Sequence, residues 1–490
     1  METLDFTLPV INLQAVLPQI ILVATALFVL LANVFHRKEK TAFIGFMSLV
    51  GSIIAAACLL VTWPASGGSS FSGMAFTDGF SFFITLTILL VLILTIMISI
   101  NYQKFFSRIN CGEYYSLILF AACGMTLMAT AGNLILIFVA LETMSISIYV
   151  LAGFHKDQLR STESALKYFL LGAFASGFLL YGFSFIYGAT GTLDIVKIGK
   201  FISNHPQLLH SKLLFAGLVM MTVGFGFKVS MVPFHMWTPD VYEGAPTVIT
   251  GFMATGVKAA AFAALIRVIL VTLIPLKGDW TSIMWIAAFL TMTVGNIVAL
   301  AQDNIKRMLA YSSIAHTGYI LIGFVASTSL AQAGMLFYLL AYALMNIGAF
   351  GVVALLRKKE GESDMVSDFA GLGFKYPMMG VAMSVFMFSL AGIPPTAGFM
   401  GKFYIFTEAI KAGYVWLVIF GAINSIISIY YYLRVVVVMY FHSSEGLVTM
   451  PAPSRTTVLA LAIACWGIIV MGIFPSYFWS FATNCVFTLM

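Results

Sequence analysis

Charged residues are scarce in this chain, which has only 25 lysines and arginines and 19 aspartates and glutamates among its 490 residues. The charged fraction is 9%, the hydrophobic fraction is 61%, and the mean hydropathy is +1.01. Because a soluble domain is about one quarter charged, this composition excludes an ordinary soluble protein. It predicts an all-α protein that crosses the membrane many times. The net charge of +6 therefore gives no reason to expect a nucleic-acid partner.

Cysteine clusters are missing as well. The cysteines show no C-x-x-C spacing and no neighbouring histidine cluster; they are Cys58, Cys111, Cys123, Cys465 and Cys485. This pattern argues against an iron–sulfur cluster, a zinc site or a disulfide. The sequence also has no glycine-rich phosphate loop and no nucleophile motif. We therefore expect no cofactor, no metal and no redox centre on this chain.

Long apolar runs dominate what remains, and about fourteen of them can span roughly 30 Å of hydrocarbon. The amino terminus lacks a basic segment followed by a small-residue cleavage site, so the first run is predicted to be a retained span. The predicted spans cover residues 13–35, 41–62, 79–101, 114–131, 133–154, 164–189, 213–237, 247–274, 281–301, 305–327, 330–356, 376–411, 414–441 and 456–475.

Basic residues are distributed unequally between the loops. The even-numbered loops hold five, and the odd-numbered loops hold fourteen, which are Arg37, Lys38, Lys40, Lys104, Arg108, Lys156, Arg160, Lys306, Arg307, Arg357, Lys358, Lys359, Lys375 and Arg455. The positive-inside rule then places the odd loops in the cytoplasm. It predicts both termini on the outer, periplasmic side of a bacterial cytoplasmic (inner) membrane.

Two of the spans contain helix-breaking proline. Pro233 interrupts helix seven, and Pro394 and Pro395 interrupt helix twelve. A proline inside an apolar helix removes a backbone donor and frees carbonyls, so such breaks usually line a hydrated cavity. Interrupted helices in corresponding halves are typical of transporters built from inverted repeats.

A second correspondence supports such a repeat. Residues 141–154 align without gaps with residues 311–324 and match at a Tyr, a Leu, a Gly and a Phe position. We expect two inverted five-helix repeats, about helices 4–8 and 9–13. The predicted division is an N-terminal three-helix segment at 1–112, repeats at 113–275 and 280–442, and a C-terminal helix and tail at 443–490.

A few titratable residues lie deep in the predicted spans. Lys228, Lys258 and Lys402 are too deep to reach the headgroups easily, and each costs about 3 kcal/mol at a helix centre, which favours a proton or ion pathway. Glu142 is interpreted as an anionic partner for a buried lysine rather than as a neutral acid. For His235 and His316, an interhelical hydrogen bond and a proton relay stay open as alternatives.

Other charges have simpler interpretations. Lys167, Arg267 and Arg434 lie near helix ends, so snorkelling to the headgroups is expected. Asp240 and Glu243 are expected to face the cytoplasm, too exposed for a catalytic role.

The run from Pro233 to Thr247, Pro-Phe-His-Met-Trp-Thr-Pro-Asp-Val-Tyr-Glu-Gly-Ala-Pro-Thr, resembles the signature of the antiporter-like subunits of proton-translocating NADH:quinone oxidoreductase, respiratory complex I. The run from Lys306 to His316 resembles the second-repeat motif of the same family. Residues 161–178 are more similar to the N-type members than to the L or M types. Lys402 is similar to the N and L pattern.

This resemblance implies a proton-translocating subunit powered by electron transfer elsewhere. It implies that Glu142 and Lys228 form a pair, that Lys258 is the central lysine, and that Lys402 leads to the outer side. NADH, FMN, iron–sulfur clusters and quinone would lie on partner subunits, among them another antiporter-like subunit and small helical subunits. A sodium/proton antiporter subunit, or the equivalent subunit of a ferredoxin- or hydrogenase-linked complex, remains the alternative.

Overall fold

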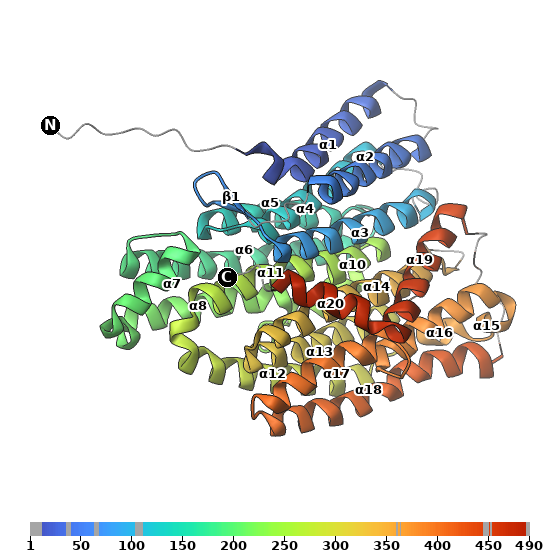
Figure 1. The fold of residues 1–490 in the computed structure, drawn as a ribbon. Helices are drawn as coiled ribbons and strands as arrows, with labels where there is room; N and C mark the ends of the chain where they lie inside the picture. The colour runs from blue at the N-terminus through green and yellow to red at the C-terminus, as the bar shows by residue number, and fades with distance from the viewer. Residues whose placement is uncertain are drawn as a thin grey trace.

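The computed structural model describes residues 12–35, 41–62, 68–102, 111–358, 361–362, 364–443, 450 and 453–486. The basic residues Arg37, Lys38, Lys40, Lys104, Arg108 and Lys359 and the chain termini lie outside these ranges. Within them the protein is a bundle of helices that run roughly parallel, with α7 at one end of the bundle and α15 at the other (Figure 1).

The α-helices are α1 (Leu17–Phe35), α2 (Thr41–Thr62), α3 (Gly79–Tyr102), α4 (Cys111–Thr130), α5 (Leu134–Ala152), α6 (Leu159–Thr190), α7 (Ile195–Asn204), α8 (Lys212–Val229), α9 (Trp237–Gly244), α10 (Thr247–Phe252), α11 (Lys258–Arg267), α12 (Lys277–Leu300), α13 (Ile305–Ala326), α14 (Ser329–Val353), α15 (Leu372–Lys375), α16 (Pro377–Ala391), α17 (Ala397–Lys411), α18 (Val415–Phe441), α19 (Arg455–Ile473) and α20 (Pro475–Val486). Two short hairpins pair β1 (Gly68–Ser70) with β2 (Ala75–Thr77) and β3 (Arg357–Lys358) with β4 (Gly361–Glu362).

The described part of the chain contains thirteen helical segments that are long and apolar enough to cross a membrane. The fourteenth predicted span, at residues 376–411, is the broken pair α16 and α17. The two counts therefore agree once the interruption is taken into account. The all-α fold of many spans is confirmed.

Several boundaries differ from the prediction, and one helix was not predicted. Helix seven ends at Val229 rather than continuing to residue 237, and α9 follows after a turn. Helix six begins five residues earlier than predicted, at Leu159. Beyond the last predicted span, α20 packs against α3 and α14.

The predicted eighth span, residues 247–274, is not a regular α-helix. Met253–Val257 and Val268–Thr272 form π-helical segments on either side of α11. Such segments are frequent at functional sites. Lys258 is the first residue of α11 and Arg267 is its last.

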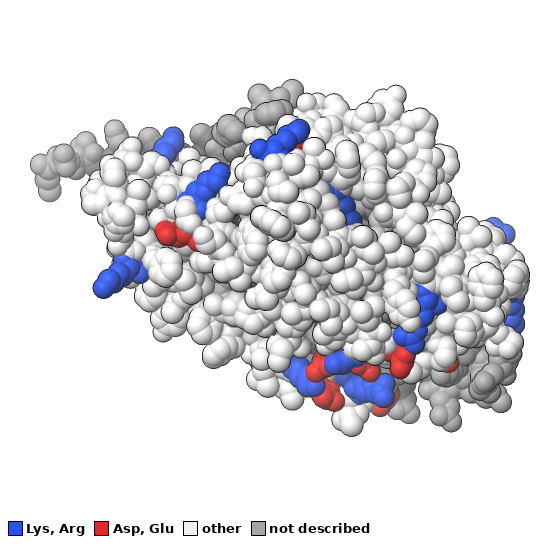
Figure 2. Space-filling view, turned by 90° about the horizontal axis from the view of Figure 1, so that it is seen from below, with Lys and Arg blue, Asp and Glu red and all other residues white. Residues whose placement is uncertain are grey.

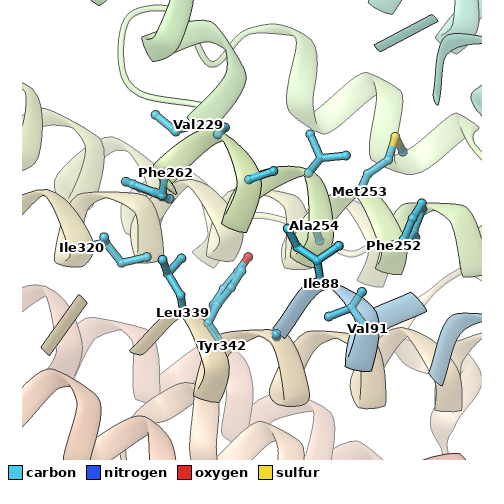
Figure 3. Close-up of a cluster of buried hydrophobic side chains, with 14 of the residues drawn as sticks. Ile88, Val91, Val229, Phe252, Met253, Ala254, Phe262, Ile320, Leu339 and Tyr342 are labelled. Atoms are coloured by element: carbon cyan, nitrogen blue, oxygen red, sulfur yellow. The ribbon is translucent and has the colours of Figure 1, made fainter. Parts of the chain in front are cut away.

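The core of the bundle is formed by α10, α11, α13 and α14, whose residues are almost all buried. Figure 3 shows side chains of these helices meeting Ile88 and Val91 of α3. In contrast, α1 and α2 expose most of their apolar side chains. The surface in Figure 2 is largely uncharged, with charges gathered in a few clusters. This pattern suits a protein surrounded by lipid and other membrane subunits.

Candidate functional site

The break after α8 ends in an organised cap. Ser230 has a positive φ of 63°, and its N–H donates to the carbonyl of Phe227 over 3.1 Å. The indole of Trp237 donates to the same carbonyl over 2.9 Å, and the Thr317 hydroxyl donates to the carbonyl of Val229 over 2.6 Å. Protein groups therefore satisfy the carbonyls that the proline interruption frees, as predicted.

The break between α16 and α17 repeats this pattern. Gly392 has a positive φ of 83°, and the next N–H, of Ile393, bonds to the carbonyl of Phe388 five residues back. After α8 the N–H of Met231 bonds to the carbonyl of Gly226, again five residues back. The two interruptions thus share one capping geometry, which supports the interpretation of a repeat.

Lys228 lies in the last turn of α8 and is buried, with 2% of its surface exposed. Its Nζ donates to Ser145 Oγ over 2.7 Å and to the Tyr149 hydroxyl over 3.2 Å. The ring centroids of Tyr149 and Tyr168 lie 5.4 and 5.8 Å from the same nitrogen. Hydroxyls and aromatic faces therefore solvate this lysine in place of a carboxylate.

Glu142 does not pair with Lys228 in this conformation. It is half-buried on α5, and its Oε1 accepts a 2.5 Å hydrogen bond from Ser176 on α6. The ion pairs found among the described residues do not include Glu142 with Lys228. The pairing of Glu142 with Lys228 therefore stays a prediction, and this conformation shows the two side chains apart. Ser145 lies three residues from Glu142 on α5, so one helix carries both the carboxylate and a lysine partner.

The tyrosine contact to Lys228 depends on Gly172 of α6. A Cβ at Gly172 would lie 2.0 Å from the Tyr149 hydroxyl, so Gly172→Ala must displace this buried ring. Loss of the hydrogen bond to Lys228 is expected to lower the free energy of unfolding by about 1 kcal/mol. The control is Gly177→Ala on the same helix, where no atom lies within 4 Å of an added Cβ. Thermal unfolding of the purified protein measures the effect, and equal stability of the two variants would contradict it.

Lys258 is buried in the middle of the bundle, with 2% exposed. Its Nζ donates to the carbonyl and the hydroxyl of Ser313, over 2.7 and 2.5 Å. The Tyr342 hydroxyl also donates to Ser313 Oγ, over 2.7 Å, and Figure 3 shows this tyrosine pointing from α14 toward α10 and α11. The central lysine is thus held by uncharged oxygen atoms.

His316, three residues beyond Ser313 on α13, lies between two tyrosines. Its Nδ1 is 2.6 Å from the Tyr338 hydroxyl, and its Nε2 is 3.0 Å from the Tyr432 hydroxyl. The Tyr432 hydroxyl also bonds to Ser312 Oγ. The imidazole therefore sits in a continuous chain of hydroxyl groups, an arrangement suited to proton relay. His235 lies instead in the turn before α9, and its buried Nδ1 has no hydrogen-bond partner among the described residues.

Lys402, on α17, is buried across the second break. Its Nζ donates to Ser425 Oγ over 2.9 Å and to the carbonyls of Leu390 and Ala391 over 3.3 and 3.2 Å. The ring centroid of Tyr319 lies 4.7 Å from this nitrogen. The interruption of helix twelve therefore supplies the carbonyls that hold the lysine.

One helix, α13, links these groups. Ser313 binds Lys258, and Thr317 binds the Val229 carbonyl next to Lys228. His316 connects the hydroxyls of Tyr338 and Tyr432. The ring of Tyr319 faces Lys402. Helix α13 thus carries His316 and contacts Lys258 and Lys402, whereas the amine of Lys228 binds residues of α5. The structure does not bring Glu142 into direct contact with any of these lysines, and it places His235 in the turn outside this arrangement.

An ion-pair network joins three helices at one end of the site. Asp240 of α9 bonds to Lys167 over 2.9 Å and to Arg307 over 2.7 Å, and Glu243 bonds to Arg307 over 3.0 Å. Burial raises the pKa of Asp240, but the two cations outweigh it and hold this pKa below its usual value. Asp240 and Glu243 are therefore structural anchors that tie α9 to α6 and α13.

The three basic residues expected to snorkel have protein partners instead. Lys167 pairs with Glu163 and Asp240, and Arg434 pairs with Asp303. Arg267 is 2% exposed and forms a bidentate pair with Asp78. Asp78 and Asp240 lie 189 and 73 positions from their partners and Asp303 lies in a loop, so the spans alone do not reveal these pairs.

Sequence reasoning also missed several polar residues. Glu408 is buried on α17, bonded to Lys411 over 2.7 Å and to the Thr328 hydroxyl over 3.4 Å. The sequence singles out Ser312, Ser313 and Thr317 as either part of a hydrated wire or helix-packing residues, but it gives no role to Ser145 and Ser425 or to the tyrosines around His316. The only available cue was that a buried lysine or histidine needs oxygen partners, which does not say which hydroxyls supply them.

Comparison with known proteins gives consistent results. The family described as "NADH:quinone oxidoreductase/Mrp antiporter, TM" matches residues 131–428. NADH-quinone oxidoreductase subunit N of Trichlorobacter lovleyi is 49% identical over 478 residues, covering 97% of each chain. F(420)H(2) dehydrogenase subunit N of Methanosarcina mazei is 39% identical, covering 96% of this chain and 98% of the relative.

A chain of respiratory complex I from Thermus thermophilus superposes with a TM-score of 0.81 at 34% identity, covering 94% of this chain and 98% of that one. A chain of the Mrp complex from Dietzia sp. superposes with a TM-score of 0.82 at 19% identity over 98% of both, which shows a shared fold. The protein therefore belongs to the NADH:quinone oxidoreductase/Mrp antiporter transmembrane family, and within it to the N-type subunits of NADH-quinone oxidoreductase.

Proposed function

We propose that this chain conducts protons from the cytoplasm to the outside as a membrane-arm subunit of NADH:quinone oxidoreductase. The observation that carries the proposal is the set of three buried lysines, Lys228, Lys258 and Lys402, each held by neutral oxygens. A lysine is costly to bury in a membrane, and ionisable residues at such depth usually mark an ion or proton pathway. Electron transfer would occur on partner subunits that carry NADH, FMN, iron–sulfur clusters and quinone.

The proposed order of proton transfer is Glu142, Lys228, Lys258, His316 and Lys402. The hydroxyls of Tyr338 and Tyr432 would connect His316 to the row. Like charges 6 to 10 Å apart interact by about 2 to 3 kcal/mol at an effective dielectric near 20. A proton that arrives at one lysine can therefore shift the protonation of the next one.

Glu142 would act as a mobile partner in this scheme. In the present conformation its carboxylate is bound by Ser176, and Lys228 is bound by Ser145 and Tyr149. A rotation of the Glu142 side chain toward Lys228 would stabilise the ammonium, and a return to Ser176 would favour release of its proton. The conformation described here then represents the separated state of the pair.

The flank of α5 and α6 is the proposed contact with a neighbouring membrane subunit. Apolar side chains are exposed there around the half-buried Glu142, with Val139, Ile146 and Phe174 exposed by 52%, 58% and 70%. A carboxylate at such a flank would be costly against lipid, so a protein partner suits it better. Another antiporter-like subunit or a small helical subunit would supply that cover.

The proposed setting is a bacterial cytoplasmic membrane with both termini outside. The positive-inside rule supports this orientation. Lys167, Asp240 and Arg307 all lie at or near odd-numbered loops, and their ion pairs agree with a position of these loops on one side of the membrane. The two five-helix repeats, at 113–275 and 280–442, are proposed as the unit of construction, supported by the matching caps at the two breaks.

A second candidate is the equivalent subunit of a complex with another electron donor, because a relative from Methanosarcina mazei is named for F(420)H(2). The test uses inverted vesicles from the source membrane, supplied in turn with NADH, reduced F420 and reduced ferredoxin. NADH-driven acidification in sodium-free buffer is expected. Acidification with only one of the other donors would select the second candidate, and a sodium-driven collapse of an imposed pH gradient without any donor response would reject both.

A further inference from the structure

The outer end of α11 is fixed by a buried ion pair that the proposed pathway does not use. Arg267 donates from Nη1 and Nη2 to the two carboxylate oxygens of Asp78, over 2.9 and 2.7 Å. Its Nε donates to the carbonyl of Ala129 over 3.1 Å. The exposed side-chain fractions of the pair are 2% and 10%. This guanidinium is therefore enclosed by protein inside the bundle.

Two aromatic rings complete the enclosure. The guanidinium carbon lies 5.2 Å from the ring centroid of Phe76 and 4.8 Å from that of Phe80. Ser81 Oγ accepts a further hydrogen bond from Nη2 over 3.2 Å. The N–H groups of the guanidinium are hydrogen-bonded and its plane lies near two aromatic rings, and these contacts fix its position.

A cavity adjoins the pair on the side of the amino-terminal helices. Gln19 of α1 and Thr85 of α3 line it together with Asp78, Ser81 and Thr130. Gln19 and Thr85 are 4% and 1% exposed, yet Gln19 Oε1 and Thr85 Oγ1 have no hydrogen-bond partner among the described residues. Buried polar atoms of this kind are normally satisfied by water. In the predicted topology, the loops beside this cavity belong to the outer face.

We propose that the cavity is a water-filled inlet from the outer face, and that Arg267, held by Asp78, seals it against the proton pathway on α11. The proposal rests on the proton-conducting function proposed above. Lys258 and Arg267 are the two ends of α11, about 13.5 Å apart at 1.5 Å per residue. Arg267 thus connects Asp78, which lines the cavity, to the helix that carries the central lysine.

A guanidinium suits a seal for two physical reasons. It has only donors and keeps its proton at all ordinary pH values, so a chain of water molecules cannot pass a proton through it. A fixed positive charge behind the cavity also opposes the entry of protons and cations, as arginine does in some channels. Asp78 keeps the charge in place and prevents an unpaired buried cation. The expected benefit is that protons reach the outside only through Lys402.

The test measures passive proton leak in vesicles that contain the complete complex. The double variant Asp78→Asn with Arg267→Gln removes both charges and retains groups that can hydrogen-bond to each other. An imposed pH gradient is expected to decay several-fold faster than in wild type without any electron donor. Adding Lys258→Met to the double variant is expected to restore tightness, because the leak runs through this lysine. The matched control is Lys197→Gln, which removes a charge from a side chain that is 71% exposed.

If the pH gradient decays at the wild-type rate in vesicles with the assembled double variant, the proposed seal is disproved and the ion pair is purely structural. If the double variant does not assemble, Arg267→Lys decides, because an ammonium keeps the charge but can give up its proton. Leak is expected there as well, and a tight membrane would overturn the proposal. These measurements need no electron transfer, so their result does not depend on whether the proposed proton pathway is correct. A failure of that pathway would instead appear as normal pumping by the single variant Lys258→Met.

Discussion

Lys258→Met is expected to abolish NADH-driven acidification of inverted vesicles while the assembled complex still oxidises NADH. Methionine has nearly the length of lysine but offers no proton to Ser313, so the proposed row of buried lysines is interrupted at its centre. Ser313 keeps its hydrogen bond from Tyr342, so the change leaves no orphaned hydroxyl. Removal of a buried charge also carries little stability cost. Pumping is therefore expected to fall to background with normal assembly.

The measurement compares acidification with quinone reduction in the same vesicles. Lys277→Met is the control, because that lysine is exposed at the start of α12. A structural scaffold would behave differently, since its lysines would matter only for assembly. Normal pumping by whatever complex assembles, with less complex in the membrane, would therefore reject a place for Lys258 in the pathway.

The sequence was informative wherever a residue type conflicted with its surroundings. Lysines inside apolar runs stand out because their burial is expensive, and so Lys228, Lys258 and Lys402 were identified correctly as buried. Proline in an apolar run marks a broken helix for an equally general reason, and both interruptions are present. These features depend on local chemistry alone.

The missing features depend on tertiary contacts. Met253–Val257 and Val268–Thr272 contain no residue that distinguishes a π-helical segment from an α-helix. The sequence therefore does not predict the two π-helical segments that flank the helix of Lys258. For Arg267 the sequence favours snorkelling to the headgroups, because its partner Asp78 lies 189 positions away. A charge near a helix end looks the same in sequence whether its partner is a lipid headgroup or a carboxylate of another helix.

Glu142 illustrates a third limit. Its presence in a span was noticed, but the identity of its partner depends on the packing of α5 against α6, which places Ser176 next to the carboxylate. Lys228 is instead solvated by Ser145 and Tyr149. Serine and tyrosine are common in membrane helices, so composition gives no signal for which of them faces a charge.

The joint between α16 and α17 gives the second large expected effect, through Gly398. Its N–H donates to Ser389 Oγ over 3.1 Å, and a Cβ at this position would lie 1.9 Å from the carbonyl oxygen of Ser389. This neighbour is backbone of α16 and cannot rotate away. Gly398→Ala must therefore push the last turn of α16 away from α17, at a cost of about 1 to 3 kcal/mol for overpacking.

The displacement would reach Lys402, because its Nζ binds the carbonyls of Leu390 and Ala391 in that same last turn. We therefore expect Gly398→Ala to lower the thermal stability of the purified complex and also to reduce protons pumped per NADH. Gly278→Ala on α12 is the control, since no atom lies within 4 Å of an added Cβ there and a change within about 0.5 kcal/mol is expected. Reduced stability with unchanged pumping would separate the packing of the joint from the function of Lys402. If both properties stayed at the level of the control, the close approach of the two half-helices would itself be disproved.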